Sequence, residues 1–555
     1  MAPVLGWPEE GLFLGLDSST QSMKVTALDS SLKVVATQAI QFDSALPQYG
    51  TTDGVHRGPN SQVTSPTLMW VEALDLVLAR LQEASFPFER VAAVSGSGQQ
   101  HGSVYWANGA RSKLQSLRPS DSLAAQLKDA FATPASPVWM DSSTAKQCKE
   151  IEDAVGGPLE LAHLTGSRAY ERFTASQIRK LYQQQPSVYE HCERISLVSS
   201  FMASLLIGDY ASIDFSDGAG MNLMDLRSKT WAPAAVQATA PGLEAKLGEL
   251  APGHGAAGKI HDYFVKKYGF SEDCTVVNWS GDNPNSFAGL ALEKPGDIAV
   301  SLGTSDTVFG VVSDPNPGLE GHVFPNPVDP SSYMTMLCYK NGSLTRQGVR
   351  DRCADKSWEH FAELVQQVSP GNDDLHGFYY DEPEILPPVP AGVLRFECKG
   401  NSAEDATPVS SFDDAHECRA IVEGQLLSMR AHSERIGMPS PPTRVIVTGG
   451  ASANQAIVAT TADVFGCDVF AAAGTDSASL GAALRAAHSL LCSQASGRDG
   501  RPHVPPSPFS DVLSNAADGS AILLTKIRSP DMKVYGEYGK HLTIRSALER
   551  LIAGM

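Results

Sequence analysis

The chain has 555 residues, a formal net charge of −19, and a composition of 42% hydrophobic and 19% charged residues. These values are typical of a globular protein and exclude a disordered or fibrous one. The length exceeds what one hydrophobic core usually organises, so we expect at least two domains. No run of Lys and Arg offsets the acidic charge, which argues against a nucleic-acid partner because phosphate contacts need clustered cations.

Cysteine use and apolar segments narrow the class further. The nine cysteines are spread singly, without a C-x-x-C pair, which suggests neither a disulfide framework nor a zinc site. The first residues, "MAPVLGWPEEGLFLGLD", lack a basic region followed by an apolar core, and the longest apolar runs are too short to cross a bilayer. We therefore expect a cytoplasmic protein without a membrane partner.

The first elements along the chain are predicted to be three strands. Apolar runs at residues 12–16, 23–28 and 32–40 are separated by turn formers, which predicts an antiparallel meander. Apolar residues then recur at helical spacing over residues 67–84, which predicts an amphipathic helix. A further strand, in "RVAAVSGSGQQHG" (residues 90–102), ends in a glycine-rich loop.

Near the middle of the chain, "NWSGDNP" (residues 278–284) places Asp282 in a run of turn formers. A glycine precedes it and Asn-Pro follows it, which predicts a tight, irregular turn and not a helix. In such a turn the carboxylate either closes the turn through a hydrogen bond to the backbone or projects into a site. The local sequence alone favours the first interpretation.

A similar pattern returns in the second half. "DIAVSLGTSDTVFGVV" (residues 297–312) predicts a strand, a Gly/Ser/Thr turn and a second strand. Aligning it with the first meander places Thr304 opposite Thr20, which suggests a repeat of whole domains. The alternative is two unrelated hairpins, which are common in α/β proteins. Asn341-Gly342, further on, predicts another tight hairpin.

The stretch "TRVIVTGGASANQAIVATTADVFGCDVF" has the order of elements found in nucleotide pockets. It predicts a buried strand at residues 445–447, a turn at Gly449-Gly450, a helix over residues 452–465 and a strand at residues 468–470. Glycines allow close approach of the backbone to a ligand, and a helix N-terminus favours an anion. A single Gly-Gly turn is a weak signal by itself.

Four stretches occur in one order: "GLDSSTQSMKV", "SGSGQQHG", "SGDNPNSFAGL" followed by "SLGTSD", and "VTGGASANQ". Together they resemble the FGGY family of carbohydrate kinases, over about residues 10–490. Within that family, "GQQHG", "PVWMDSSTAKQC" and "YERFTASQI" resemble the xylulokinase subfamily, and "GHVFPNP" and "GFYYDEPEI" resemble its eukaryotic branch.

The resemblance implies an α/β fold of two ribonuclease-H-like (actin-like ATPase) domains with a catalytic cleft between them. Residues 1–292 would form the N-terminal domain, which carries the sugar site and the first phosphate hairpin. Residues 293–555 would form the C-terminal domain, with the second phosphate hairpin and the adenine site. The implied reaction is ATP-dependent phosphorylation of D-xylulose to D-xylulose 5-phosphate.

The resemblance also implies roles for individual residues. Asp282 would be the catalytic base that accepts the proton of the sugar hydroxyl, and Asn283 would hold a neighbouring hydroxyl. Asp17 resembles the residue that places Mg²⁺, which keeps much of its hydration shell. The other implied sugar-binding residues are Gln100, His101, Trp139, Asp141 and Arg172. The implied nucleotide-binding residues are Ser18, Ser19, Thr20, Gln21, Gly303, Thr304, Ser305, Trp358, Gly449, Gly450 and Asn454.

Competing interpretations remain at this stage. An Asp before a Ser-rich turn is usually a cap, a loop His is usually solvated, and Trp139 and Trp358 suit core packing. Lys24 is not assigned, because strand alternation allows it to point either way. The protein could instead be a sibling kinase acting on ribulose, glycerol or gluconate, or an actin-like nucleotide switch, which needs neither "GDN" nor a sugar loop. The expected partner is a small sugar, and the expected state is a monomer or homodimer.

Overall fold

The computed structural model describes residues 7–8, 10–400, 402–472, 476–499, 506–516, 520 and 522–554. Its internal contacts divide the chain into two compact units. The first unit comprises residues 1–293, 324–331 and 474–523, and the second comprises residues 294–323, 332–473 and 524–555. Both units are therefore discontinuous in sequence. The division of the chain into domains at residues 292 and 293 stays a prediction.

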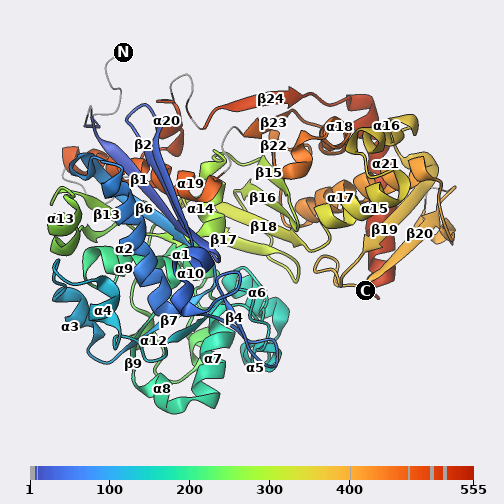
Figure 1. Cartoon of the computed structure of the whole chain (residues 1–555). Coiled ribbons are helices and arrows are strands. Elements are labelled where there is room, and N and C mark those ends of the chain that lie inside the picture. Colours follow the sequence, from blue (N-terminus) through green and yellow to red (C-terminus); the bar gives the residue numbers. More distant parts are fainter. Residues whose placement is uncertain are drawn as a thin grey trace. The chain divides into compact units, whose positions relative to one another are not determined.

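The first unit is built on a seven-stranded sheet (Figure 1). Its strands lie in the order β12 (Ala256–Lys259), β13 (Thr275–Val277), β6 (Val91–Gly98), β1 (Leu12–Ser18), β2 (Ser22–Leu28) and β3 (Val34–Gln41), and β14 (Ser280–Gly281) also pairs with β6. β1, β2 and β3 are antiparallel neighbours, whereas β6 runs parallel to β1, β13 and β14. The predicted meander is confirmed.

The second unit repeats this arrangement. Its sheet contains β18 (Tyr333–Tyr339), β16 (Asp306–Val312), β15 (Asp297–Leu302), β22 (Arg444–Thr448), β23 (Val469–Ala472) and β24 (Leu524–Arg528), in this order. β18, β16 and β15 are antiparallel neighbours, and β15, β22 and β23 are parallel neighbours. The run β3-β2-β1-β6-β13 of the first unit therefore has the same order and directions as β18-β16-β15-β22-β23. The predicted structural repeat is present.

Different helices cover the two faces of the first sheet. Leu14 and Leu16 of β1 lie in a core cluster with α2 (Thr67–Glu83), whereas Phe13 lies in a cluster with α19 (Ser477–Asp499). Successive strand residues point to opposite faces, so β1 is buried on both sides. This explains its continuous apolar run. The helix predicted over residues 67–84 is confirmed.

Glycines allow α19 to approach β1 and α14 (Asp282–Gly289) closely. A Cβ placed on Gly15 would lie 2.1 Å from the carbonyl oxygen of Ser479, and one on Gly481 would lie 1.7 Å from that of Asn285. Neither position accepts a side chain without backbone movement. The close approach packs α19 along α14, with Ser477 beside Gly289 and Gly481 beside Asn285.

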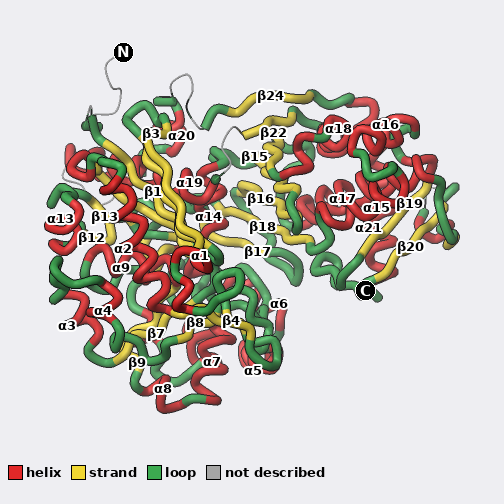
Figure 2. Tube along the Cα trace, in the orientation of Figure 1, coloured by secondary structure: helices red, strands yellow, loops and turns green. Residues whose placement is uncertain are grey.

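Two helices of the second unit contact its large sheet, as Figure 2 shows for α17 beside β16 and α18 beside β22, and α15, α16 and α21 pack against α17. These helices are α15 (Ser343–Cys353), α16 (Trp358–Gln367), α17 (Asp414–Arg435), α18 (Gln455–Phe465) and α21 (Met532–Ala553). A small sheet of β19 (Leu375–Tyr380), β20 (Gly392–Glu397) and β21 (Thr407–Pro408) completes the unit.

The first unit carries further short elements. Its small sheets pair β4 (His56–Arg57), β5 (Val63–Pro66) and β8 (Ala135–Pro137), β7 (Ser103–Ala107) with β9 (Cys192–Leu197), and β10 (Ile213–Asp214) with β11 (Leu250–Ala251). Its other helices include α5 (Ala145–Val155), α7 (Thr174–Gln184), α9 (Val198–Ile207), α10 (Phe215–Ala219) and α13 (Asp262–Tyr268). Over the whole described part of the chain, no helix combines the length and apolar character needed to cross a bilayer.

The hairpin predicted at Asn341-Gly342 is wrong. β18 ends at Tyr339, and Gly342 caps the N-terminus of α15. The Ser343 N–H donates a 2.7 Å hydrogen bond to the carbonyl of Gly303, which ties this helix start to the turn between β15 and β16. A tertiary contact, and not the local turn propensity of Asn-Gly, decides the backbone path here.

Candidate active site

Three neighbouring strand ends bring the acidic candidates of the first unit together. Asp17 of β1 is in register with Ser97 of β6, and Gly281 of β14 is in register with Gly98 of β6. The strands β1, β6 and β14 are parallel, so their carboxyl ends share one edge of the sheet, where ligands of open α/β sheets bind. Asp282 follows Gly281 directly and lies at this edge.

Asp282 is the first residue of α14, and Gly281 is its N-cap. The irregular turn expected there is therefore wrong, because a proline two residues later is tolerated in the first turn of a helix. Oδ1 of Asp282 accepts hydrogen bonds from the backbone N–H of Gln100 at 3.2 Å and of Asn283 at 2.9 Å. The Asn283 amide adds a third contact at 3.3 Å. No described residue donates to Oδ2.

The environment of Asp282 raises the pKa of its carboxyl to about 7. Burial is the main cause, and the negative charge of Asp17 adds to it, while the N–H groups of Gln100 and Asn283 act in the opposite direction. A carboxyl with a pKa near neutrality can both take up and release a proton under physiological conditions. Oδ2 is the atom available for this, since the hydrogen bonds of the protein go to Oδ1.

Asp17 is fully buried at the end of β1. Oδ1 accepts a 2.6 Å hydrogen bond from the Ser97 hydroxyl, and Oδ2 accepts one from Ser19. Burial raises the pKa of its carboxyl. The ammonium of Lys24, which the sequence left unassigned, lies 3.8 Å from Asp17 Oδ2 and 3.4 Å from Asp476 Oδ2. Lys24 therefore faces this acidic edge.

The turn between β1 and β2 contains the remaining phosphate candidates. The Ser18 hydroxyl is buried and has no hydrogen-bond partner within the described residues. The Ser19 N–H donates a 2.9 Å hydrogen bond to the carbonyl of Ser22, which closes the turn. Thr20 accepts a 2.8 Å hydrogen bond from the indole of Trp139, and Gln21 is exposed. The turn is thus tied both to its own hairpin and to a distant loop.

His101 and Arg172 form a second group, at the loop that follows β6. Nδ1 of His101 lies 3.0 Å from the carbonyl oxygen of Gly220, and the imidazole packs at 4.4 Å from the Phe173 ring. Burial, and then the charge of Arg172, lower the pKa of His101 to about 3, so the ring is neutral. A carbonyl only accepts hydrogen bonds, so Nδ1 carries the proton and Nε2 is an acceptor. The Arg172 guanidinium lies 5.0 Å from the centroid of the Tyr170 ring.

Trp139 and Asp141, two candidates for the sugar site, lie in different environments. Trp139 is 45% exposed, so core packing does not explain it. Asp141 is buried and already accepts hydrogen bonds from Val63 N at 2.9 Å, Gln177 Nε2 at 2.8 Å and both the backbone and hydroxyl of Ser143. These four bonds leave its oxygens little capacity for a sugar hydroxyl. The assignment of Asp141 to the sugar stays a prediction, and this geometry does not favour it.

In the second unit, the ends of β15 and β22 are neighbours in the same way. Ser301 is in register with Thr448, which places the turn at residues 303–305 beside Gly449 and Gly450. Gly449 has φ +85°, and a Cβ there would lie 2.5 Å from the carbonyl oxygen of Leu302. A Cβ on Gly450 would meet nothing within 4 Å. Gly449 is required by the backbone, whereas Gly450 borders open space.

Trp358 and Asn454, the adenine candidates, lie together. Asn454 caps α18, because Oδ1 accepts hydrogen bonds from the N–H groups of Ala456 at 3.0 Å and Ile457 at 3.2 Å. Its Nδ2 donates a 3.4 Å hydrogen bond to the carbonyl of Trp358. Trp358 begins α16 and is only partly buried, with the Arg350 guanidinium 4.7 Å from its ring. Trp358 is therefore not a core residue.

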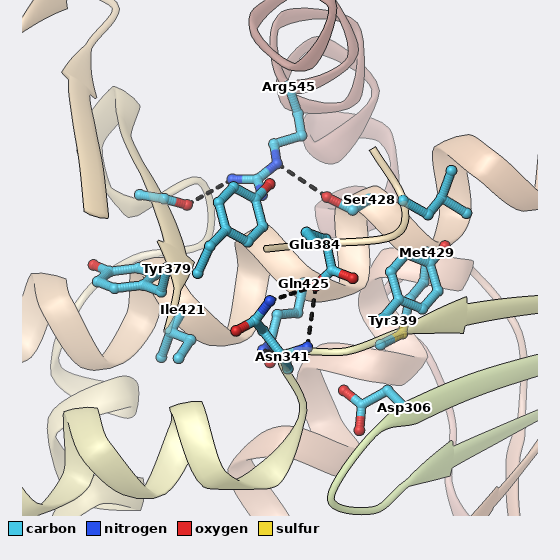
Figure 3. Close-up of a pocket in the computed structure, with 13 residues that line it drawn as sticks. Asp306, Tyr339, Asn341, Tyr379, Glu384, Ile421, Gln425, Ser428, Met429 and Arg545 are labelled. Atoms are coloured by element: carbon cyan, nitrogen blue, oxygen red, sulfur yellow. Dashed lines mark hydrogen bonds between the residues drawn. The ribbon is translucent and has the colours of Figure 1, made fainter. Parts of the chain in front are cut away.

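A small polar cavity lies behind the turn at residues 303–305. Its volume is about 30 Å³, which suits one or two water molecules and is far too small for a nucleotide or sugar. Figure 3 shows Asn341 bonded to Glu384 and Arg545 bonded to Ser428 in its wall. Asp306, also in the wall, forms a buried ion pair with Arg346 at 2.6 Å. The residues of its wall lie next to the turn, and the cavity is not the substrate site.

Sequence reasoning missed three buried charged residues near Asp282, namely Asp214, Asp217 and Arg485. The Arg485 guanidinium donates to Asp214 Oδ2 at 3.2 Å and to Asn285 Oδ1 at 3.0 Å. Arg485 is the one cation in the small-residue stretch "SLGAALRAAHSLL", and such a residue in a buried helix needs a carboxylate partner. That signal could have identified Arg485. Asp214 and Asp217 carried no comparable signal.

The chain matches known sequences over most of its length. Residues 129–289 match the N-terminal domain, and residues 298–490 the C-terminal domain, of the FGGY family of carbohydrate kinases. "Xylulose kinase 2" of Arabidopsis thaliana is 55% identical over 553 residues, 98% of this chain and 98% of that protein. "Xylulose kinase" of Mus musculus is 50% identical over 86% of each chain, and that of Schizosaccharomyces pombe is 38% identical over 96% of this chain and 97% of the other.

Solved structures show the same fold. The ligand-bound xylulose kinase of Lactobacillus acidophilus superposes with a TM-score of 0.76 at 18% identity, covering 98% of both chains. The glycerol kinase of Plasmodium falciparum, solved with ADP, has a TM-score of 0.71 at 14% identity and also covers 98% of both chains. At these low sequence identities, the two comparisons show that the fold is shared.

Proposed function

Because the chain belongs to the FGGY family of carbohydrate kinases, we propose that it transfers the terminal phosphoryl group of ATP to D-xylulose and forms D-xylulose 5-phosphate. The observation that carries this proposal is the 55% identity, over 98% of the chain, to a protein named as a xylulose kinase. The partly exposed Asp282 at the shared edge of three strands supports it, because transfer to an alcohol needs a group that takes the hydroxyl proton.

Asp282 is proposed as the general base. Its Oδ2 takes the proton of the terminal hydroxyl, while the bonds from Gln100 and Asn283 hold Oδ1 in place. The pKa near 7 supports this role, because a base works best when its pKa lies close to the operating pH. A base of this kind contributes about 10²- to 10⁴-fold to the rate.

The sugar is proposed to bind beside Asp282. His101 offers the acceptor Nε2 to one sugar hydroxyl, and the charge of Arg172 suits a carbonyl or hydroxyl oxygen. Asn283, whose amide is bonded to Gln100 Oε1 at 2.9 Å, orients a hydroxyl next to the reacting one. Trp139 supplies an exposed apolar wall. These assignments are predictions for a ketose, which presents several such oxygens.

The phosphate groups of ATP are proposed to lie against the turn of Ser18, Ser19, Thr20 and Gln21. The buried Ser18 hydroxyl, which no described residue satisfies, supports a polar ligand here. Asp17 also fits a bound Mg²⁺, because Mg²⁺ binds through one or two carboxylates and completes its shell with phosphates and water. Among the described residues, no three or more His, Cys, Asp or Glu side chains lie together in a group that could hold a metal ion. When bound, Mg²⁺ supplies charge compensation for the phosphates.

The second unit is proposed to bind the rest of the nucleotide. Gly303, Thr304 and Ser305 repeat the position of the first phosphate turn, which supports a contact with the terminal phosphate. The open space at Gly450 and the exposed part of Trp358 support binding of adenosine beside Asn454. A cytoplasmic location and a monomeric or homodimeric state stay predictions.

An assay that couples ADP release to an optical signal tests the function. Purified protein is given Mg-ATP with D-xylulose, D-ribulose, glycerol or D-gluconate, and we expect the highest kcat/KM with D-xylulose. EDTA should remove the activity and added Mg²⁺ should restore it. Preference for another sugar would contradict the substrate assignment, and ADP release that ignores every sugar would indicate a nucleotide switch.

A further inference from the structure

Two buried polar atoms beside Asp282 lack hydrogen-bond partners in the part of the chain that the structure describes. One is Oδ1 of Asp217 in α10, and the other is Nε2 of Gln100; each residue is 2% exposed. One atom is an acceptor and the other a donor. Nearly all buried polar groups in proteins are paired, so two complementary unpaired groups at one place call for an explanation.

Both residues touch Gly281, the residue before Asp282. A Cβ placed on Gly281 would lie 3.0 Å from Asp217 Oδ1, 2.9 Å from Gln100 Cγ and 3.1 Å from Gln100 Cδ. The two side chains thus meet over one α-carbon. One bridging water would join the Gln100 amide to the free Oδ1 of Asp217 while the Gln100 side chain keeps its hydrogen bond to Asn283.

Asp217 is held rigidly. Its Oδ2 accepts a 2.5 Å hydrogen bond from Ser199, and its backbone N–H donates a 2.9 Å hydrogen bond to Asp214 Oδ1. Asp214 in turn accepts a 2.6 Å hydrogen bond from Ser280 and pairs with Arg485 at 3.2 Å. Asp217 is therefore fixed to a buried frame that includes α9, α10, β14 and α19.

Gln100, in contrast, contacts the reacting groups. Its backbone N–H is bonded to Asp282 Oδ1 at 3.2 Å, and its Oε1 accepts from the Asn283 amide at 2.9 Å. Gln100 therefore lies between Asp217, which it meets at Gly281, and the proposed base. Rotation of its side chain would release Asn283 and, through it, the carboxyl of Asp282.

We propose that Asp217 is a positioning residue that acts through Gln100 and keeps the Asn283 amide and the Asp282 carboxyl in the geometry for proton abstraction. The inference rests on the proposed role of Asp282.

The test compares Asp217→Leu with Asp217→Asn in the full-length protein. Leu removes the acceptor, so kcat should fall about 10- to 100-fold, as expected for a misplaced catalytic group, while KM for D-xylulose and for ATP changes less than about threefold. Asn keeps an oxygen for Gln100 and should restore most of kcat. In a Gln100→Leu background, Asp217→Leu should add no further loss, because the two residues act as one unit.

Asp75→Asn is the matched control. Asp75 is a buried carboxylate of α2 that accepts hydrogen bonds from Tyr263 and Tyr268 at 2.8 to 2.9 Å, outside the strand edge described above. It should lower the melting temperature without changing kcat. If Asp217→Leu does not fold, Ser199→Ala, which frees Oδ2 of Asp217, replaces it in the cycle with Gln100→Leu.

Several outcomes would overturn the inference. They are an unchanged kcat in Asp217→Leu, a loss that Asn does not recover, additive losses with Gln100→Leu, or a rise in KM for the sugar at constant kcat, which would indicate direct sugar contact. Failure of the proposed function is seen separately, as absent D-xylulose turnover in the wild type. The variants are then compared on whichever sugar the wild type phosphorylates.

Discussion

The indole Nε1 of Trp139 donates a 2.8 Å hydrogen bond to the hydroxyl of Thr20. Trp139 follows β8, and Thr20 lies in the turn between β1 and β2, so this bond ties the proposed wall of the sugar site to the proposed phosphate turn. Trp139 is 45% exposed, which means that packing contributes little to its position. This hydrogen bond therefore links the two loops directly.

Trp139→Phe should weaken ATP binding. The ring remains but the N–H donor is lost, and one net hydrogen bond is worth about 0.5–1.5 kcal/mol, so KM for ATP should rise about 2- to 12-fold. Steady-state kinetics at saturating D-xylulose measures this. In a Thr20→Val background the same change should have no further effect. An unchanged KM for ATP would show that the bond does not stabilise the turn.

Asp282→Asn should retain sugar and nucleotide binding but lose turnover. Asn keeps the oxygen that accepts from Gln100 and Asn283 but cannot take the hydroxyl proton, so kcat should fall by about 10²- to 10⁴-fold. Calorimetric titration with D-xylulose checks that binding survives. Wild-type turnover in this variant would remove Asp282 from its assigned role.

The pH dependence of kcat/KM should have an acid limb near pH 7. The pKa of Asp282 is raised to about 7, and the ionised form is the base, so activity should be lost as the pH falls through about 7, by up to tenfold per unit. Initial rates between about pH 5.5 and 9, with the coupling enzymes in excess at each pH, measure the limb. A midpoint below about pH 5 would contradict the environment described for this carboxyl.

The thermal stability of Asp282→Asn should exceed that of the wild type at high pH only. The folded-state pKa is raised above the ordinary value of 3.8, so folding takes up a proton between about pH 4 and 7, and the wild type loses stability as the pH rises through that range. Asn carries no charge to desolvate. We expect a melting temperature about 1–4 °C higher than wild type at about pH 8 and nearly equal at about pH 4.5. Equal melting temperatures at both pH values would contradict this.

Gly449 and Gly450 should respond differently to alanine. Gly449 has φ +85° and a Cβ there would lie 2.5 Å from the carbonyl oxygen of Leu302, so Gly449→Ala should lower the melting temperature by several degrees, at a cost of about 1–3 kcal/mol. A Cβ on Gly450 meets nothing within 4 Å, so Gly450→Ala should have the same melting temperature as the wild type. Differential scanning fluorimetry compares the pair. Equal losses in both variants would contradict the backbone argument.

Local pattern predicted much of the scaffold. The strands β1, β2 and β6, the helix α2 and the strand β22 followed from apolar spacing and turn residues, because these features depend on a few neighbouring residues. The same local rules failed at Asp282, which begins α14, and at Gly342, which caps α15. In both cases glycine and its polar neighbours are compatible with a turn or a helix start, and contacts distant in sequence select the helix.

By itself, the sequence determined the family, the repeat of two similar sheets and the identity of the candidate base. Motif order and strand periodicity are properties of the linear sequence, so they can be seen without a structure. Only the tertiary structure decided that Asp282 has a pKa near 7, that His101 is neutral, and that Asp217 faces Gln100. Burial and charge create these properties, and the groups responsible lie far apart in sequence. Arg485, for example, supports α14 through Asn285 from 200 residues away, a distance at which composition and spacing carry no information about contact.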